Sequence, residues 1–373
     1  MIIGVPKEIK PQEYRVGLVP SSVKELTLHG HQVLIQTGAG DGVGISDADY
    51  EKVGGKIAPT AEDVFADAAM IVKVKEPQES EYALLREGQI LFTYLHLAPD
   101  SQLTDALLKS KAIGIAYETV TSSRNDLPLL APMSEVAGRM AIQVGAVSLQ
   151  RSNGGSGILL SGVPGVQSGK VLIIGGGVVG LNAAIMAMGM GANVTIMDKN
   201  IDRLRQLDIQ FGRRLTAIYA TRHAIEAHVA QADLIIGAVL VPGAAAPKLV
   251  TREMLNIMKP GSVLVDVAID QGGCFETSRP TTHENPTYTL DGIVHYCVAN
   301  MPSGVARTSA FALNNATLPY VLKMATQGCE SALTDDPYFI NGLNVYKGYI
   351  TQEQVARDQN RSYTNPRDIL KTA

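Results

Sequence analysis

The chain has 373 residues, of which 46% are hydrophobic and 18% are charged, and its formal net charge is −4. This length supports roughly two domains, each with its own core, and the slight negative charge gives no electrostatic basis for binding nucleic acid or an anionic membrane. The three cysteines are scattered and form no CxxC pair, so we expect neither a metal cluster nor a disulfide framework.

The sequence shows no targeting or membrane-spanning signal. The longest apolar stretch, residues 171–197, is interrupted by glycines and asparagines. The N-terminal segment MIIGVPKEIKPQEYR lacks the basic region and apolar core of a secretory signal. We therefore expect a cytoplasmic protein with no membrane partner.

Short apolar runs alternate with helical patterns over the first 120 residues. Helices are predicted at 22–29, 80–86 and 101–109, and Ser22 with Glu25 forms a predicted capping box. Such alternation predicts a parallel sheet covered on both faces. The predicted strands are 2–5, 32–36, 70–74, 89–95 and 112–117.

The second half of the chain repeats this pattern after one long helix. That helix is predicted over 132–150 with Ser134 as its N-cap, and a glycine-rich connector follows it. A further helix over about 308–325 and a polar tail complete the chain, and we expect this helix to return to the first domain. Six strands of a doubly wound sheet are predicted at 171–174, 193–197, 217–220, 234–238, 263–267 and 293–298.

A glycine motif opens this second alternation. Gly175, Gly177 and Gly180 follow a strand and precede a helix at the G-x-G-x-x-G spacing that cradles a dinucleotide pyrophosphate. Asp198 lies 23 residues after Gly175, where its carboxylate suits the ribose hydroxyls of NAD, although the nearby Arg203 weakens the preference over NADP. The alternative is a structural turn beside a surface aspartate. We predict NAD binding and no metal.

The fold class that follows is α/β, with two doubly wound parallel-sheet, Rossmann-like domains linked by long helices and separated by a cleft. Residues 1–130 with 305–373 are the predicted substrate domain, which is discontinuous, and residues 131–304 are the predicted NAD-binding domain.

Ionisable residues follow several predicted strands. Because ligands bind beyond the carboxyl ends of parallel strands, Arg15, Lys75, His96 and Asp270 are candidates for binding a small carboxylate and moving protons. Each also has a structural alternative: a solvated arginine, a lysine paired with Glu76, a satisfied histidine and an aspartate that caps a loop. Their joint occurrence favours a site in the cleft.

With these residues in place, the chain resembles the bacterial alanine dehydrogenases over nearly its whole length. The strings that carry the resemblance include GVPKEIKPQEYRVGLVP, VKVKEP, YLHLA, LPLLAPMSEVAGRMA, IGAVLVPGAAAPKLVT and VDVAIDQGGCFETSRPTTHENP. The resemblance implies reversible oxidative deamination of L-alanine to pyruvate and ammonium with reduction of NAD, and it implies a homohexamer.

The resemblance also assigns roles to individual residues. His96 and Asp270 are expected to be catalytic, and Arg15 and Lys75 to bind substrate. Independently of the resemblance, Met133 is a candidate for lining a small apolar pocket, and Asn300 is a further candidate for the substrate site. The expected cofactor contacts are Ser134, Gly175, Gly177, Val178, Val179, Gly180, Asp198, Arg203, Ala220, Val239, Leu240, Val267, Ala268, Ile269, Asp270, Arg279, Val298 and Met301.

The chain departs from the expected pattern at two places. The segment PSGVARTSA follows Met301 where PGAVPRTST is expected, which leaves the shape of that loop open. Ala220 occupies a position where serine is expected, so a contact there is limited to backbone or apolar atoms.

Three other functions stay open at this point. A 2-hydroxyacid dehydrogenase carries an Asn-x-Ala-Arg-Gly-like segment, which MKPGSVLVDVAID does not offer. The NAD-binding component of a transhydrogenase is expected to be followed by hydrophobic segments, whereas NPRDILKTA ends this chain. A non-catalytic NAD-binding scaffold would not need Lys75, His96 and Asp270.

Overall fold

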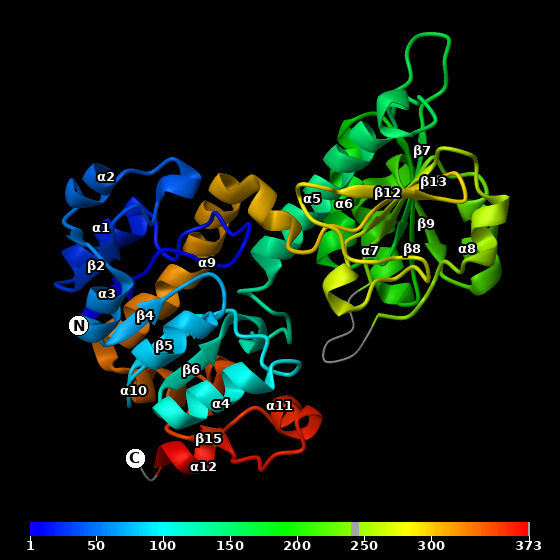
Figure 1. Cartoon of the computed structure of the whole chain (residues 1–373). Helices are drawn as coiled ribbons and strands as arrows, with labels where there is room; N and C mark the ends of the chain where they lie inside the picture. The colour runs from blue at the N-terminus through cyan, green and yellow to red at the C-terminus, as the bar shows by residue number, and fades with distance from the viewer. Residues whose placement is uncertain (240–245, 372–373) are drawn as a thin grey trace. The chain divides into compact units, whose positions relative to one another are not determined.

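Two parallel-dominated sheets organise the chain (Figure 1). The computed structural model describes residues 1–239 and 246–371. They divide into unit 1, which is Met1–Met133 with Val305–Ala373, and unit 2, which is Ser134–Gly304. The sequence predicted the boundaries between the two domains at residues 130/131 and 304/305. The predicted α/β, Rossmann-like fold class is confirmed, although both sheets carry antiparallel edge strands.

Unit 1 contains an eight-stranded sheet in the order β15-β14-β6-β5-β4-β1-β2-β3. Strands β1 to β6 pair in parallel, whereas β14 is antiparallel to β6 and β15 to β14. Short, fully buried apolar runs such as β4 are typical of parallel strands covered on both faces. The strands are β1 Ile2–Val5, β2 Gln32–Gln36, β3 Lys56–Ala58, β4 Met70–Val72, β5 Ile90–Thr93, β6 Ile113–Ala116, β14 Leu343–Tyr346 and β15 Tyr349–Ile350.

Helices cover both faces of this sheet. Ile71 and Leu91 pack into one core with apolar residues of α3 and α4, while the Phe92 ring on the other face lies 6.4 Å from Tyr320 of α9. Helix α9 lies in unit 1 with the N-terminal residues. The helices of unit 1 are α1 Pro20–Leu28, η1 Asp41–Val43, α2 Asp47–Glu51, α3 Ala61–Asp67, η2 Glu79–Leu84, α4 Ser101–Ser110, η3 Tyr117–Thr119, α9 Ala306–Gln327, α10 Cys329–Thr334, η9 Phe339–Gly342, α11 Glu353–Asp358 and α12 Pro366–Lys371.

Unit 2 contains a seven-stranded sheet in the order β12-β13-β11-β10-β7-β8-β9. The six predicted strands are present and parallel, and β12, which was not predicted, is antiparallel to β13. The strands are β7 Lys170–Ile174, β8 Asn193–Asp198, β9 Thr216–Tyr219, β10 Leu234–Gly237, β11 Val263–Asp266, β12 Thr287–Leu290 and β13 Ile293–Tyr296.

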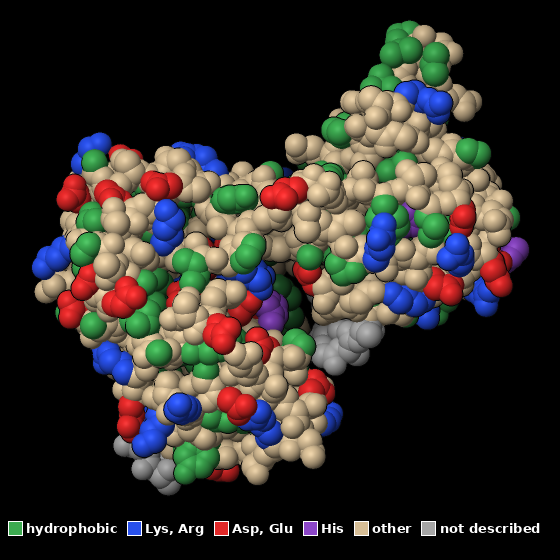
Figure 2. Space-filling model, in the orientation of Figure 1, with side chains coloured by type: hydrophobic (Ala, Val, Ile, Leu, Met, Phe, Trp, Pro, Cys, Tyr) green, Lys and Arg blue, Asp and Glu red, His purple; other side chains and the backbone are tan. Residues whose placement is uncertain are grey.

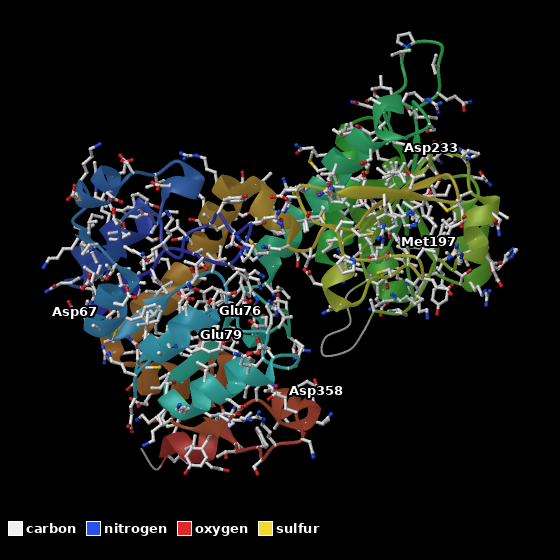
Figure 3. The ribbon with its side chains drawn as sticks, viewed as in Figure 1. Asp67, Glu76, Glu79, Met197, Asp233 and Asp358 are labelled. Carbon is white, nitrogen blue, oxygen red and sulfur yellow. The ribbon has the colours of Figure 1, made fainter. Side chains whose placement is uncertain are left out.

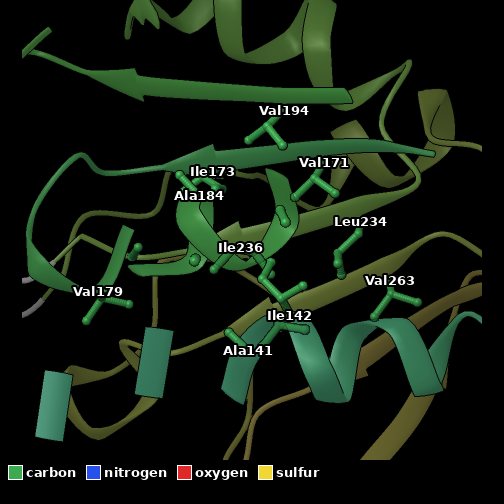
Figure 4. Close-up of a cluster of buried hydrophobic side chains, with 14 of the residues drawn as sticks. Ala141, Ile142, Val171, Ile173, Val179, Ala184, Val194, Leu234, Ile236 and Val263 are labelled. Atoms are coloured by element: carbon green, nitrogen blue, oxygen red, sulfur yellow. The ribbon is translucent and has the colours of Figure 1, made fainter. Parts of the chain in front are cut away.

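Alternate residues of β7 enter the two cores of unit 2, as the period of a strand requires. Val171 and Ile173 pack with Ala141 and Ile142 of α5 (Figure 4), whereas Leu172 packs on the opposite face against α8 and η6. The helices involving unit 2 are α5 Ala131–Ser148, which crosses the unit boundary, η4 Arg151–Asn153, α6 Val178–Gly189, α7 Ile201–Phe211, η5 Gly212–Arg214, α8 Arg222–Val229, η6 Glu253–Ile257, η7 Ile269–Gln271 and η8 Met301–Val305.

Two predicted helix caps are wrong. Helix α1 begins at Pro20 with Val19 as its N-cap, so Ser22 lies inside the helix. The ring of Pro20 fixes its φ angle near the helical value, which favours proline at the first helical position. The helix therefore begins two residues before Ser22. Helix α5 begins at Ala131, so Ser134 also lies inside a helix and is not its cap.

The surface of the described residues is mixed in charge. Lys and Arg side chains alternate with Asp and Glu side chains over the visible face of each unit (Figure 2). Within the described ranges, no helix is both long and apolar enough to cross a membrane.

Candidate active site

The carboxyl ends of four neighbouring strands form one edge of the unit 1 sheet. In the order β1, β4, β5 and β6, these strands lie side by side and run in the same direction. Arg15 follows β1 by a loop, Lys75 follows β4 and His96 follows β5. The hydroxyl of Thr93 donates to the carbonyl of Lys75 over 2.9 Å, and this hydrogen bond joins the ends of β4 and β5. Unit 1 therefore brings three of the predicted site residues to one edge.

Arg15 is buried, with 2% of its surface exposed. Its Nε and Nη2 donate to the Glu13 carboxylate over 2.6 and 2.5 Å, and its Nη1 lies 2.9 Å from the sulfur of Met133. Burial disfavours the charged guanidinium, but the hydrogen bonds and charge of Glu13 outweigh burial and raise the pKa of Arg15. Arg15 is therefore a fixed cation held in place by a carboxylate that the sequence did not single out.

Tyr94 and Met133 provide the apolar part of this region. Both side chains are buried, and the Tyr94 hydroxyl donates to the carbonyl of Leu129 over 2.6 Å. The Tyr94 ring stacks on His96 with ring centroids 5.9 Å apart and an interplanar angle of 6°. Burial raises the pKa of Tyr94, so the phenol stays neutral at physiological pH.

A buried ion cluster supports the end of β4. Lys73 lies 2.9 Å from Glu81 and 3.4 Å from Glu8. Burial disfavours its ammonium, but the charges of Glu8 and Glu81 outweigh burial and raise the pKa of Lys73. The Glu8 carboxylate also accepts from the backbone N–H groups of Val74 and Lys75 over 2.6 and 3.4 Å. Glu8 thus holds the backbone at the position from which Lys75 projects.

The charges of both Lys10 and Lys75 act on Glu76, the residue that the sequence offers as a partner for Lys75. Glu76 makes its ion pair with Lys10, from the loop that follows β1. Figure 3 labels Glu76 beside the sheet of unit 1. The pKa of Glu76 is lowered because the hydrogen bond and charge of Lys10 outweigh burial, which is the largest single influence and acts in the opposite direction.

The glycine turn of unit 2 fits a dinucleotide. Gly175 has φ +110°, and a Cβ on Gly180 would lie 1.8 Å from the carbonyl oxygen of Gly175, so both positions require glycine. Gly177 is the N-cap of α6, and a Cβ there would meet nothing within 4 Å, which leaves room for a phosphate at the helix N-terminus. This turn has the form that a pyrophosphate requires.

Asp198 lies at the carboxyl end of β8, beside this turn. Its two oxygens accept from the N–H groups of Gly176 and Asn200 over 2.7 and 2.8 Å. The Nε of Arg203 donates to the carbonyl of Gly176 over 2.6 Å, so this arginine also braces the turn. Met197, the residue before Asp198, and Asp233, which precedes β10, mark opposite ends of the sheet (Figure 3).

Asp270 and Asp266 play different structural parts. Asp270 is exposed in η7, just after β11. Asp266 is buried and accepts from the N–H groups of Cys274 and Phe275 over 3.0 and 3.1 Å and from the Ser278 hydroxyl over 2.5 Å. Asp266 is therefore the residue that caps the loop, and Asp270 is the carboxylate that solvent reaches.

The other predicted contacts differ in accessibility. Leu240 lies outside the described residues. Arg279 lies over the Tyr288 ring at 4.3 Å, and Asn300 adopts a left-handed backbone with φ +57°. Val178 is exposed. Buried positions are Val179, Ala220, Ile269, Val298 and Met301; partly buried ones are Ser134, Val239, Val267, Ala268 and Asn300.

The predicted site residues are divided between the units. Arg15, Lys75, His96 and Met133 belong to unit 1, whereas Asp270, Asn300 and the predicted cofactor contacts belong to unit 2. Within the described part of the chain, no group of three or more His, Cys, Asp or Glu side chains could hold a metal ion.

Similarity to known proteins covers both units. The family description "Alanine dehydrogenase/PNT, N-terminal domain" matches residues 4–137, and "Alanine dehydrogenase/PNT, C-terminal domain" matches residues 141–353. The chain belongs to the alanine dehydrogenase/PNT family. A family member from Halomonas elongata, named alanine dehydrogenase, is 58% identical over 370 residues, which are 99% of this chain and 100% of that protein.

Solved structures of the family agree with this assignment. A structure named L-alanine dehydrogenase is 52% identical and has a TM-score of 0.94, covering 96% of this chain and 99% of that one. A transhydrogenase from Sinorhizobium meliloti is 26% identical with a TM-score of 0.83, covering 94% of this chain and 100% of that one. The predicted resemblance to the alanine dehydrogenases is thereby confirmed.

Proposed function

We propose that this protein catalyses the reversible oxidative deamination of L-alanine to pyruvate and ammonium with reduction of NAD. The observation that carries the proposal is the set of Arg15, Lys75 and His96 at the ends of adjacent strands in unit 1. A cation for a carboxylate, an amine for a carbonyl oxygen and an imidazole for proton transfer are the groups that this reaction needs. The full-length similarity to alanine dehydrogenases supports the same substrate.

Arg15 binds the substrate carboxylate in this proposal. Glu13 fixes the guanidinium through its Nε and Nη2 atoms, and the Met133 sulfur lies beside Nη1. The Met133 and Tyr94 side chains are buried beside the guanidinium and limit the space for the substrate side chain. A methyl group fits such a restricted apolar surface better than a longer side chain.

His96 and Lys75 act on the groups bonded to the α-carbon of the substrate, which are the amine and the incoming oxygen. His96 removes a proton from the attacking water and returns one to the departing amine, for which an imidazole near neutral pH is suited. Lys75 stabilises the substrate oxygen as it becomes the carbonyl of pyruvate. Asp270, an exposed carboxylate of unit 2, orients the amine or the water.

The cofactor is NAD in this proposal. A bound nicotinamide would supply the hydride acceptor for the α-carbon of alanine. Gly175, Gly177 and Gly180 would hold its pyrophosphate together with the N–H groups at the start of α6. The Asp198 carboxylate at the end of β8 would accept from the ribose hydroxyls and repel a 2′-phosphate, which favours NAD over NADP.

We further propose a cytoplasmic homohexamer. The connector after α5 carries Leu159, Val163 and Val166 with 61%, 54% and 64% of their surfaces exposed, and Val163 and Val166 form an isolated antiparallel bridge. Apolar side chains gather at the tip of this loop (Figure 2). Such apolar surface is more favourable when another subunit covers it.

A substrate and cofactor panel tests the function. We expect rapid reduction of NAD with L-alanine, slower reduction with serine or glycine, and none with lactate, because the proposed proton transfers require an amine. NADP is expected to be reduced more slowly than NAD because of Asp198. Formation of reduced NAD with lactate and not with alanine would instead favour a 2-hydroxyacid dehydrogenase, and reduction with neither would favour a transhydrogenase-type component.

A further inference from the structure

His96 has an unusual backbone conformation for a residue other than glycine. Its φ is +48°, in the left-handed region, where the Cβ of an L-residue is crowded. The residue directly follows the extended segment that begins with β5, so the chain changes direction where the imidazole projects. Strained backbone at a reactive residue persists only when neighbouring groups hold it.

The group that holds this backbone is the carboxylate of Glu118. Its Oε1 accepts from the N–H of His96 over 2.6 Å and from the N–H of Leu95 over 3.2 Å. Its Oε2 also lies 3.3 Å from the N–H of Leu95. Hydrogen bonds from backbone N–H groups to a carboxylate are among the stronger ones in proteins. One side chain therefore satisfies two consecutive N–H groups at the turn.

Glu118 also faces the imidazole ring itself. Its Oε1 lies 3.9 Å from Nδ1 of His96, and the Tyr94 ring stacks on the same imidazole. This arrangement turns Nδ1 towards the carboxylate and leaves Nε2 on the opposite side of the ring. The His96 side chain is 48% exposed, whereas that of Glu118 is 14% exposed. The imidazole of His96 is therefore the more accessible of the two side chains, and the Glu118 carboxylate lies behind it.

Glu118 is itself fixed by the sheet. It lies in η3, which directly follows β6, and β6 pairs with β5. The preceding residue, Tyr117, is fully buried, and the Asn344 side chain donates to the Thr119 hydroxyl over 2.7 Å. The carboxylate is thus held between two anchored neighbours at the end of the adjacent strand.

We infer that Glu118 is a positioning residue for the reaction: it holds His96 in the left-handed conformation that aims its imidazole at the substrate. This inference rests on the proposed function of His96 in proton transfer. It assigns to Glu118 an effect on turnover that passes entirely through His96, with no contact to alanine or to the cofactor.

Two substitutions of Glu118 test the acceptor role. Glu118→Ala removes the acceptor, and we expect kcat for alanine to fall about 10-fold or more with little change in KM, because a misplaced proton-transfer group lowers the rate of the chemical steps. Glu118→Gln keeps an amide oxygen for the two N–H groups and is expected to restore most of kcat. A Glu118→Gln enzyme as impaired as Glu118→Ala would overturn the inference.

A double-mutant cycle separates positioning from an independent role. We expect the pair His96→Ala with Glu118→Ala to have the same kcat as His96→Ala alone, because the carboxylate acts through the imidazole. A kcat of the double variant that is lower than that of His96→Ala by the full factor lost in Glu118→Ala would contradict the inference. Near-normal turnover of His96→Ala alone would instead overturn the proposed function of His96, so the two failures can be told apart.

A stability measurement tests the backbone argument without an activity assay. Glycine adopts positive φ readily, so Glu118→Ala should lower the melting temperature less in a His96→Gly background than in the wild type. Equal decreases in both backgrounds would contradict the inference.

The matched control is Asp336→Ala. Asp336 Oδ1 accepts from the consecutive N–H groups of Tyr338 and Phe339 over 3.0 Å each, the same pattern as Glu118, in a segment between α10 and η9. We expect this control to lower the melting temperature and to leave kcat unchanged. A loss of kcat in the control as large as in Glu118→Ala would mean that general destabilisation explains both, which would overturn the inference.

Discussion

Replacing His96 with alanine is expected to lower the turnover of alanine by about 10²-fold or more, which is the usual contribution of a positioned acid–base group. The imidazole lies at the end of β5, exposed on one side and backed by Tyr94 and Glu118 on the other. The methyl side chain that replaces the imidazole at position 96 cannot transfer protons. The steps that add water to the imine and release the amine therefore slow down. The cofactor motif of unit 2 is untouched, so NAD binding should persist.

The measurement combines steady-state kinetics with a titration of reduced-cofactor fluorescence. His29→Ala is the control, since His29 lies at the exposed end of α1 and its ring bonds only locally, to the carbonyl of Glu25 over 2.8 Å. Wild-type turnover in His96→Ala would remove His96 from the mechanism. Loss of cofactor binding in that variant would show that the substitution acts on more than proton transfer.

Replacing Lys73 with methionine is expected to lower the free energy of unfolding by about 3–5 kcal/mol, the range observed when one partner of a buried ion pair is removed. Lys73 is fully buried between Glu8 and Glu81. Without the ammonium, two buried carboxylates face each other with no cation between them. The control is Lys52→Met, because the Lys52 side chain is 73% exposed and its pair with Asp49 contributes little.

The loss caused by Lys73→Met should depend on pH. Burial already raises the pKa of Glu8, and the Lys73 charge is the largest influence that lowers it, so this pKa rises further in the variant. A carboxyl group whose pKa is raised in the folded state stabilises the fold below its unfolded pKa, and this stabilisation is lost as the pH rises through the folded pKa. Urea unfolding should therefore show a larger deficit at pH 8 than at pH 5. An equal deficit at both pH values would contradict the buried-charge account.

The central strands of both sheets could be predicted from the sequence because each is a short apolar run between turn residues. The strands that were missed are the sheet-edge strands β3, β12 and β15 and the antiparallel strand β14. β12 and β3 have partly exposed residues, so they lack the continuous apolar pattern of a buried parallel strand. β14 is buried, but it lies in the polar C-terminal segment and pairs with a strand more than 200 residues earlier in the chain.

The candidate site could be predicted only in part. Arg15, Lys75 and His96 follow predicted parallel strands, and the rule that ligands bind at carboxyl ends places such residues together. The supporting carboxylates Glu8 and Glu118 could not be found in this way. Glu118 lies 22 residues from His96 along the chain, and its contact exists because β5 and β6 are neighbours in the sheet. A single sequence does not show which strand ends become neighbours.

The central claim is that the bond between the α-carbon of alanine and its hydrogen supplies the hydride. Alanine labelled with deuterium at the α-carbon tests this claim most directly. We predict that wild-type protein with NAD forms pyruvate, ammonium and reduced cofactor in equal amounts, with one deuterium in each reduced nicotinamide. Reduced cofactor that carries no deuterium, or labelled alanine that yields no pyruvate, would contradict it.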